Sequence, residues 1–208
     1  TKPTNQGYKK MKKQLIVIGI LILLTSVEFS GCTETKKTIE PLTDTDWNYF
    51  VWQHNSTDTI TYYMTKTSNL TSNISRYTQN TSFYNLDSTI QNFTQLNATA
   101  KKWNQNILQN SQENSKFNLS SRMNEHRNIY TRWLNDNRNI SQIQIDMAKL
   151  FFLKDTQLQF TISNYLNQVS TSMTSAQKHL TTLMNWFNNT ISEEEWNTWT
   201  ANRDWSFL

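Results

Sequence analysis

The chain has 208 residues, a formal net charge of +4 and three glycines, all of which precede Cys32. The rest of the chain therefore excludes folds built on tight hairpins, phosphate-cradling loops or nucleophile elbows, because these need glycine at positive φ. After Cys32 the basic and acidic residues balance at 15 each, so the net positive charge belongs to the N-terminal segment and does not indicate nucleic-acid binding.

The N-terminal segment has the layout of a secretory signal. Four lysines at positions 9, 10, 12 and 13 precede an apolar stretch at residues 15–24, which is shorter than the ~20 residues that span a membrane. The small residues Ser30 and Gly31 then stand before Cys32, the only cysteine in the sequence. We expect residues 1–31 to be a leader that is removed on maturation.

The stretch Phe29-Ser30-Gly31-Cys32 resembles the lipobox of the lipoprotein precursor class, with Phe29 where leucine is commonest. The Lys-, Ile- and Asn-rich background resembles archaeal cell-surface lipoproteins. This resemblance covers residues 1–32 and implies that Cys32 is lipidated and holds the chain on the outer face of the cytoplasmic membrane. The alternative is an uncleaved N-terminal anchor with an unmodified Cys32, which also places the remaining chain outside the membrane.

The lipidated Cys32 and a flexible tether are expected to occupy residues 32–46, a Thr-rich, charged stretch without apolar periodicity. Residues 47–208 are expected to form an extracytoplasmic helical domain. Asn, Gln, Ser and Thr make up nearly half of the chain after Cys32, a bias that also occurs in disordered segments. The balanced charge and the eight tryptophans argue against disorder, because a solvated tail has few aromatic residues.

Apolar residues recur with a helical period. The clearest case is a seam with steps of four and three residues, typical of a heptad repeat. Its members are Ile162, Leu166, Val169, Met173, Ala176, Leu180, Leu183 and Phe187. Seams with more polar residues run through 63–84, 86–107 and 119–140, and no segment alternates as a half-buried strand would. The sequence therefore predicts an all-α domain.

The number of helices depends on where the chain turns. The best turn candidate is residues 111–115, which contain Asn and Ser, and weaker candidates are 80–88 and 135–139. Together they predict an antiparallel bundle of three or four long helices with a short C-terminal helix. The alternative is an elongated two-helix antiparallel coiled-coil hairpin. The adjacent Phe151 and Phe152 favour the bundle, because a two-helix hairpin would expose one of them.

An isolated peptide of residues 60–110 is expected to be mostly unfolded in water. Ser, Thr and Asn each cost up to ~0.7 kcal/mol against Ala in a helix interior, so these helices need tertiary contacts along their seams. Far-ultraviolet circular dichroism of the peptide tests this expectation, which a strong helical spectrum would contradict.

No arrangement of residues indicates catalysis, so we expect no enzyme, no cofactor and no metal site. His54 and Asp58 share a helix face, but a metal site takes three or four ligands, and we interpret the two as a surface pair. The acidic run 193–195 is expected to lie at the positive end of a helix dipole. There Ser192 and Glu195 would form a capping box.

Two other features could mark function. The first is a candidate aromatic interface that would contact lipid headgroups, glycans or a protein. The alternative is that the same residues cap the core of the domain. The tryptophans of this candidate interface are Trp47, Trp52, Trp196, Trp199 and Trp205. An even number of long helices would bring both ends of the domain together. The second is a set of candidate glycosylation acceptors in Asn-x-Ser/Thr motifs: Asn55, Asn69, Asn73, Asn80, Asn92, Asn97, Asn118, Asn139 and Asn188.

These observations predict a membrane-anchored surface lipoprotein with a helical interaction or spacer domain. Its expected partners are the membrane, through the lipid on Cys32, and another protein or a second copy of the chain. The alternative is an extracytoplasmic receptor or sensor domain with a small-ligand pocket between helices.

Overall fold

The computed structural model describes residues 41–77 and 82–201, without the side chains of residues 199 and 200. The expected leader and Cys32 lie outside these residues. One compact unit is Glu40–Phe187, and the described part of a second unit is residues 188–201.

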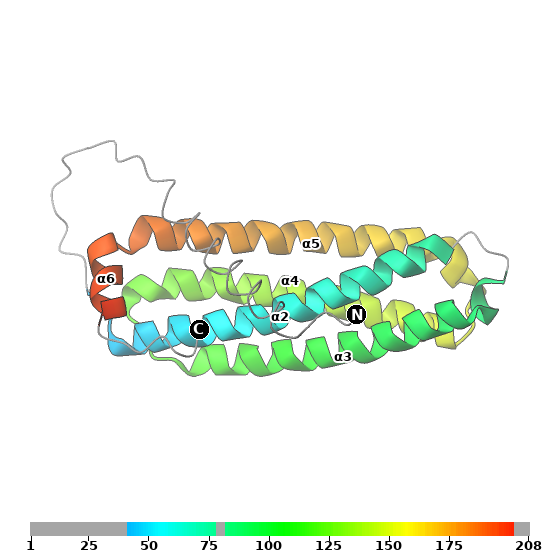
Figure 1. Ribbon diagram of the computed structural model, residues 1–208, viewed down its shortest axis with the longest axis horizontal. Helices are drawn as coiled ribbons and strands as arrows, with labels where there is room; N and C mark the ends of the chain where they lie inside the picture. Colours follow the sequence, from blue (N-terminus) through cyan, green and yellow to red (C-terminus); the bar gives the residue numbers. More distant parts are fainter. Residues whose placement is uncertain (1–40, 78–81, 202–208) are drawn as a thin grey trace, which may run out of the picture. The chain divides into compact units, whose positions relative to one another are not determined.

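The first unit consists of long helices that run alongside one another (Figure 1). The elements of the described chain are α2 (Asp44–Tyr77), η1 (Phe83–Asn85), α3 (Asp87–Lys116), α4 (Ser121–Phe152), α5 (Thr156–Thr190) and α6 (Glu193–Ala201). The backbone of α3 lies close to those of α4 and α2, whereas α5 stands farther away and packs through its side chains. The described residues contain no strand. The all-α bundle of four long helices and a short one is therefore confirmed, and the two-helix hairpin is wrong.

Only one of the three expected turns lies where the sequence placed it. The described part of the connection between α2 and α3, residues 82–86, falls within 80–88, but 111–115 lies inside α3 and 135–139 inside α4. The hydroxyls of Ser111 and Ser115 donate to backbone carbonyls of the same helix, so these polar side chains are satisfied without a turn.

The last long helix begins after a tight turn at residues 153–155. The N–H of Lys154 donates to the carbonyl of Phe151, and the N–H of Asp155 donates to that of Leu150. This pair of bonds is a Schellman motif, in which the residue in the position of Lys154 takes the left-handed conformation. Lys154 has a φ of 52°, a region that favours glycine.

Replacing Lys154 with glycine is expected to raise the free energy of unfolding by about 1 kcal/mol, because glycine takes positive φ without a steric penalty. Urea denaturation of the two proteins measures the difference. Lys149→Gly, at an exposed position in the last turn of α4, should instead destabilise the fold.

The heptad seam of α5 faces the core as the sequence predicts. Ile162, Val169, Ala176 and Leu183 are buried, and the alternate seam positions between them are half-buried. The seam through 119–140 is buried at every position after Leu119. In the seam through 86–107 one residue departs from the pattern, because Ile90 is exposed.

One end of the bundle, the entry end, joins the start of α2 to distant parts of the chain. The N–H of Ser120 donates to Oδ1 of Asp46 at 3.0 Å, which connects α2 to the α3–α4 connection. The ring centroids of Phe50 and Phe187 lie 5.4 Å apart, which connects α2 to the last part of α5. The start of the first long helix and the end of the fourth therefore meet, as expected for an even number of helices.

The opposite end, the turn end, holds the α2–α3 connection and the α4–α5 turn. The hydroxyl of Tyr84 donates to the carbonyl of Asp155 and joins the two. Beneath them lies an aromatic core in which Phe93 and Phe151 stack with centroids 4.0 Å apart, and Phe83 packs edge-on against both. All three of these rings are buried.

The parallel helices α2 and α4 are joined by polar contacts at a nearly constant sequence offset. In each pair the partners are 73 or 74 residues apart: Asp46 with Ser120, Gln53 with His126, Ser56 with Tyr130 and Thr71 with Gln144. A shift of α2 along α4 by one turn would break all of these contacts. They therefore define one axial register in an interior whose apolar seams are interrupted by polar residues.

Candidate functional site

An open groove of about 440 Å³ lies between α4 and α5. Amide and hydroxyl side chains dominate its lining: Asn139, Gln142, Ile143, Asn167, Gln168, Thr171 and Ser172. No charged side chain is among these residues, so the groove offers hydrogen-bond donors and acceptors to a neutral polar ligand and no counter-ion to a charged one.

A second polar cluster lies in the interior near the entry end. The hydroxyl of Tyr49 on α2 donates to Oδ1 of Asn114 on α3, and Nδ2 of Asn114 donates to Oγ1 of Thr131 on α4, both at 2.9 Å. The hydroxyl of Tyr130 donates to that of Ser56 at 2.7 Å. Burial raises the pKa of both tyrosines, that of Tyr130 to about 12, so they remain neutral donors. The cluster therefore connects three helices.

His126 on α4 is a buried histidine of this interior. Its side chain is 3% exposed, and its Nε2 lies 2.6 Å from Oε1 of Gln53. Because an amide oxygen only accepts, Nε2 carries the proton. The rings of Trp186 and Phe50 pack against the imidazole, at 4.6 Å and 5.2 Å between centroids. Burial lowers the pKa of His126 to about 3, so the imidazole is neutral at physiological pH.

Asp46 fixes the first turn of α2. Its carboxylate accepts from the N–H and the hydroxyl of Thr43 at 2.9 Å and 2.8 Å, and from the N–H of Ser120. Burial opposes ionisation of this carboxyl, but the hydrogen bonds from Thr43 and Ser120 outweigh it and lower the pKa. Asp46 is therefore a buried anion held by charge-assisted hydrogen bonds.

The tryptophans of the expected aromatic interface occupy different environments. Trp47 is buried, while Trp52 is half-buried and packs on Phe117 and Tyr130. Trp196 on α6 is half-buried. The side chain of Trp199 and all of Trp205 lie outside the described residues, so a shared interface stays a prediction.

The candidate glycosylation acceptors also differ in position. Asn80 lies outside the described residues, and Asn188 lies near the end of α5. Those inside α2, α3 or α4 are Asn55, Asn69, Asn73, Asn92, Asn97 and Asn139. Asn118 lies in the α3–α4 connection and is exposed. Because acceptor asparagines occur in surface loops, Asn118 is better placed than the acceptors within helices.

The remaining sequence predictions concern polar side chains at the surface. Nε2 of His54 lies 3.9 Å from Oδ2 of Asp58, too far for a hydrogen bond; His54 is half-buried and Asp58 is exposed. No group of three metal-ligating residues occurs within the described ranges. On α6 the capping box is confirmed: the N–H of Glu195 donates to Oγ of Ser192 at 3.1 Å, and the N–H of Ser192 donates back to Oε2 of Glu195 at 3.0 Å.

The groove and the His126–Gln53 contact were not predicted from the sequence. His126 occupies a position in the seam through 119–140. A polar residue at a core-facing position needs a buried hydrogen-bond partner, and this need was the one sign in the sequence of such a contact. The groove residues had no such signal, because Asn, Gln, Ser and Thr are abundant on every face of these helices.

Comparison of the chain with protein-family models, with curated proteins and with solved structures gives no match. None of the described helices combines the length and the apolar character that crossing a membrane requires.

Proposed function

We propose that the chain is a surface lipoprotein, anchored through Cys32 on the outer face of the cytoplasmic membrane, whose helical domain serves as an interaction or spacer module. The observation that carries the proposal is the sequence of the first 32 residues, in which a basic segment, a short apolar stretch and Ser-Gly-Cys follow in order. The stretch expected to be a tether, residues 32–46, follows in the sequence, and α2 already begins at Asp44 within it.

The construction of the bundle supports a spacer role. Its long helices have 30 to 35 residues each, so they reach about 45–53 Å at 1.5 Å per residue. The hydrogen bonds of Asp46 hold the first turn of α2, next to the tether, to the α3–α4 connection. A domain built in this way holds its far end at a defined distance from its point of attachment.

Lipidation is tested by mass spectrometry of the N-terminal peptide of the full chain, recovered from membranes of a host that matures lipoproteins. The expected peptide begins at Cys32 and carries acyl chains. The Cys32→Ser variant should keep its leader and carry no lipid, while the matched Thr33→Ser variant should mature normally. A free thiol on Cys32 in the membrane-bound wild-type chain would contradict the proposal.

The groove between α4 and α5 favours a second candidate, a receptor for a neutral polar ligand such as a sugar. The expected result is a rise in the melting temperature of the full chain with one member of a panel of sugars and amino acids. The rise should disappear in Asn167→Ala, which removes an amide from the groove. It should persist in Asn164→Ala, an exposed asparagine of α5 outside the groove. A ligand that stabilises both variants equally would not bind in the groove.

A further inference from the structure

The helix α5 is the long helix that the rest of the bundle holds least closely. Its backbone approaches those of the other long helices least. It has six buried residues, whereas α2, α3 and α4 have nine or more each. The open groove described above lies between it and α4. Separating α5 from the bundle therefore disturbs fewer buried residues than separating any other of the long helices.

The side chains of α5 nevertheless fit specific partners on the other helices. Nδ1 of His179 lies 2.7 Å from Oδ2 of Asp136 on α4. The ring of Trp186 packs on that of His126, and Leu158 belongs to the core cluster at the turn end. A second copy of the chain carries the same partners in the same arrangement, so it offers α5 a binding surface that is already complementary.

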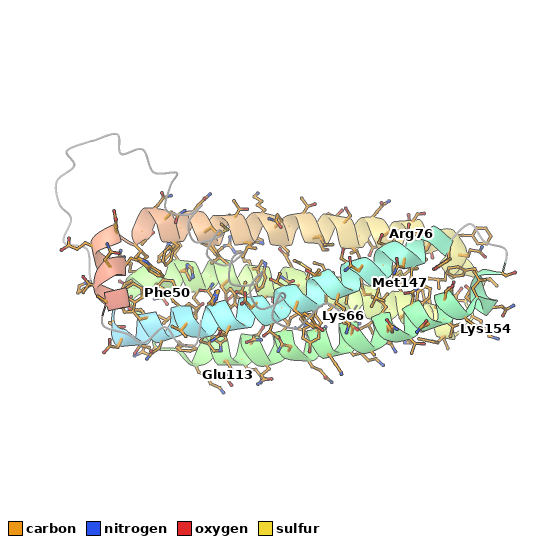
Figure 2. The ribbon with its side chains drawn as sticks, in the orientation of Figure 1. Phe50, Lys66, Arg76, Glu113, Met147 and Lys154 are labelled. Atoms are coloured by element: carbon orange, nitrogen blue, oxygen red, sulfur yellow. The ribbon has the colours of Figure 1, made fainter. Side chains whose placement is uncertain are left out.

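The connection that holds α5 to its own bundle is short and strained. Residues 153–155 form the shortest connection between two long helices of the described chain. Lys154, which is labelled at this turn in Figure 2, has a φ of 52°. This left-handed conformation brings Cβ too close to the following carbonyl oxygen. The closed turn therefore carries a strain that a straightened chain would lose.

The same residues can continue the helix. None of residues 153–155 is glycine or proline, and leucine and lysine are good helix formers. In the closed turn the N–H groups of Lys154, Asp155 and Leu158 each donate to a backbone carbonyl. In a continuous helix these N–H groups would donate to the carbonyls four residues earlier, so opening loses no backbone hydrogen bond. What the closed turn alone has is the bond from the hydroxyl of Tyr84 to the carbonyl of Asp155 and the cap of Asp155 on Gln157.

A continuous helix would also keep the core-facing residues of α4 and α5 in phase. Phe151 and Leu158 are both buried in the same core cluster and are seven residues apart. Seven residues make nearly two helical turns, so the two side chains would lie on one face of a straight helix. The straightened α5 would therefore present its buried seam on the side on which α4 presents its own, as packing on a second bundle requires.

We propose that two copies of the chain exchange α5: the turn at residues 153–155 straightens, and α5 of each copy packs on α2, α3 and α4 of the other. Such an exchange reuses contacts that each single chain already makes, so no new surface has to fit. A short hinge under strain is the feature that favours it. The inference goes beyond the proposed function and does not rest on it, because every residue in the argument lies within the helical domain.

Concentration determines which form is present. The single chain and the exchanged dimer share the contacts of α5, and association costs translational and rotational freedom. The closed monomer is therefore expected at low concentration and the dimer at high concentration. Because α5 must leave its own bundle before it can enter another, the form adopted during folding is expected to persist.

The experiment uses the full chain with Cys32→Ser, so that the only cysteines are those introduced by Asp136→Cys/His179→Cys. The protein is unfolded in urea and refolded in a mild detergent over a range of concentrations. Size-exclusion chromatography with light scattering then separates monomer from dimer, and each is treated with a short bis-maleimide cross-linker. We expect the fraction of dimer to rise with the refolding concentration. On a denaturing gel the dimer should be linked between its two chains, and the monomer within its one chain.

A second cysteine pair is the matched control. Asn114→Cys/Thr131→Cys replaces a contact of 2.9 Å between α3 and α4, which the exchange leaves within one chain. This pair should therefore link within the chain in monomer and dimer alike.

Substitutions in the hinge test the cause. Lys154→Gly should raise the dissociation constant of the dimer at least about tenfold, because glycine removes the strain of the closed turn and weakens the continuous helix. Lys149→Gly is the control, since residue 149 is helical in both forms, and it should leave the dissociation constant unchanged. Asp155→Ala removes the cap on Gln157 and should lower the dissociation constant severalfold.

Three results would overturn the proposal. The first is absence of a dimer at every refolding concentration. The second is a dimer in which Asp136→Cys/His179→Cys links only within each chain, because this would show that the copies associate through another surface with α5 in place. The third is an equal dissociation constant for Lys154→Gly and the unchanged hinge, which would mean that the turn at residues 153–155 does not open.

Discussion

Replacing Phe93 with alanine is expected to lower the free energy of unfolding by about 3–5 kcal/mol, the usual cost of removing a fully buried phenylalanine. Phe93 has no exposed surface, stacks on Phe151 and packs edge-on against Phe83, so its removal leaves a cavity that three helical segments enclose. Urea denaturation followed by circular dichroism measures the change.

Phe160→Ala is the matched control, because it removes the same side chain from a position that is 85% exposed. Its effect should stay within about 0.5 kcal/mol, as for most surface substitutions. Equal destabilisation by the two substitutions would mean that the aromatic core at the turn end does not exist in solution.

The second large effect is a loss of stability in mild acid caused by His126. Burial holds its pKa at about 3 in the folded chain, below the 6.5 of an exposed imidazole. As the pH falls below about 6.5 the unfolded chain takes up a proton that the folded chain does not, so unfolding becomes more favourable. The free energy of unfolding should therefore fall by about 1.4 kcal/mol per pH unit between pH 6 and pH 4.5 from this group.

Substitution isolates the contribution of His126. His126→Gln keeps a donor toward Gln53, and about one proton fewer should be taken up on unfolding in mild acid. His54→Gln, at a histidine that is only half-buried, should leave the pH dependence unchanged. The comparison stays above about pH 4.5 because Asp46, whose pKa is lowered from 3.8, adds its own loss of stability at lower pH. An unchanged slope in His126→Gln would show that the imidazole is not buried in its neutral form.

The helices could be predicted because their apolar residues repeat with a helical period. The seam from Ile162 to Phe187 is nearly free of polar residues, and α5 contains all of it. The ends of the helices were harder to place. Ser111 and Ser115 are turn formers by propensity, but their hydroxyls bond to carbonyls within α3. At the α4–α5 turn the left-handed position belongs to a lysine, Lys154, where sequence rules look for glycine or asparagine.

Less of the candidate sites could be predicted, because they depend on which polar residues meet. Gln53 and His126 are 73 residues apart and come together only once α2 and α4 lie parallel in one register. The exposure of Phe160 could not be predicted either, since an aromatic residue near the start of an amphipathic helix ordinarily faces the core. Phe152 also departs from the sequence argument, which favoured a bundle because a two-helix hairpin would expose one of the two adjacent phenylalanines: in the bundle Phe151 is buried and Phe152 is still 46% exposed.

The constant offset between α2 and α4 determines where the chain can tolerate a change in length. An extra residue in the α3–α4 connection alters the numbering of the pairs but leaves both helices in place. A residue deleted from α2 between Gln53 and Thr71 rotates everything beyond it by about 100° and moves it along the axis by about 1.5 Å. Natural variants of this chain should therefore carry their insertions and deletions in the connections, while α2 and α4 keep their lengths.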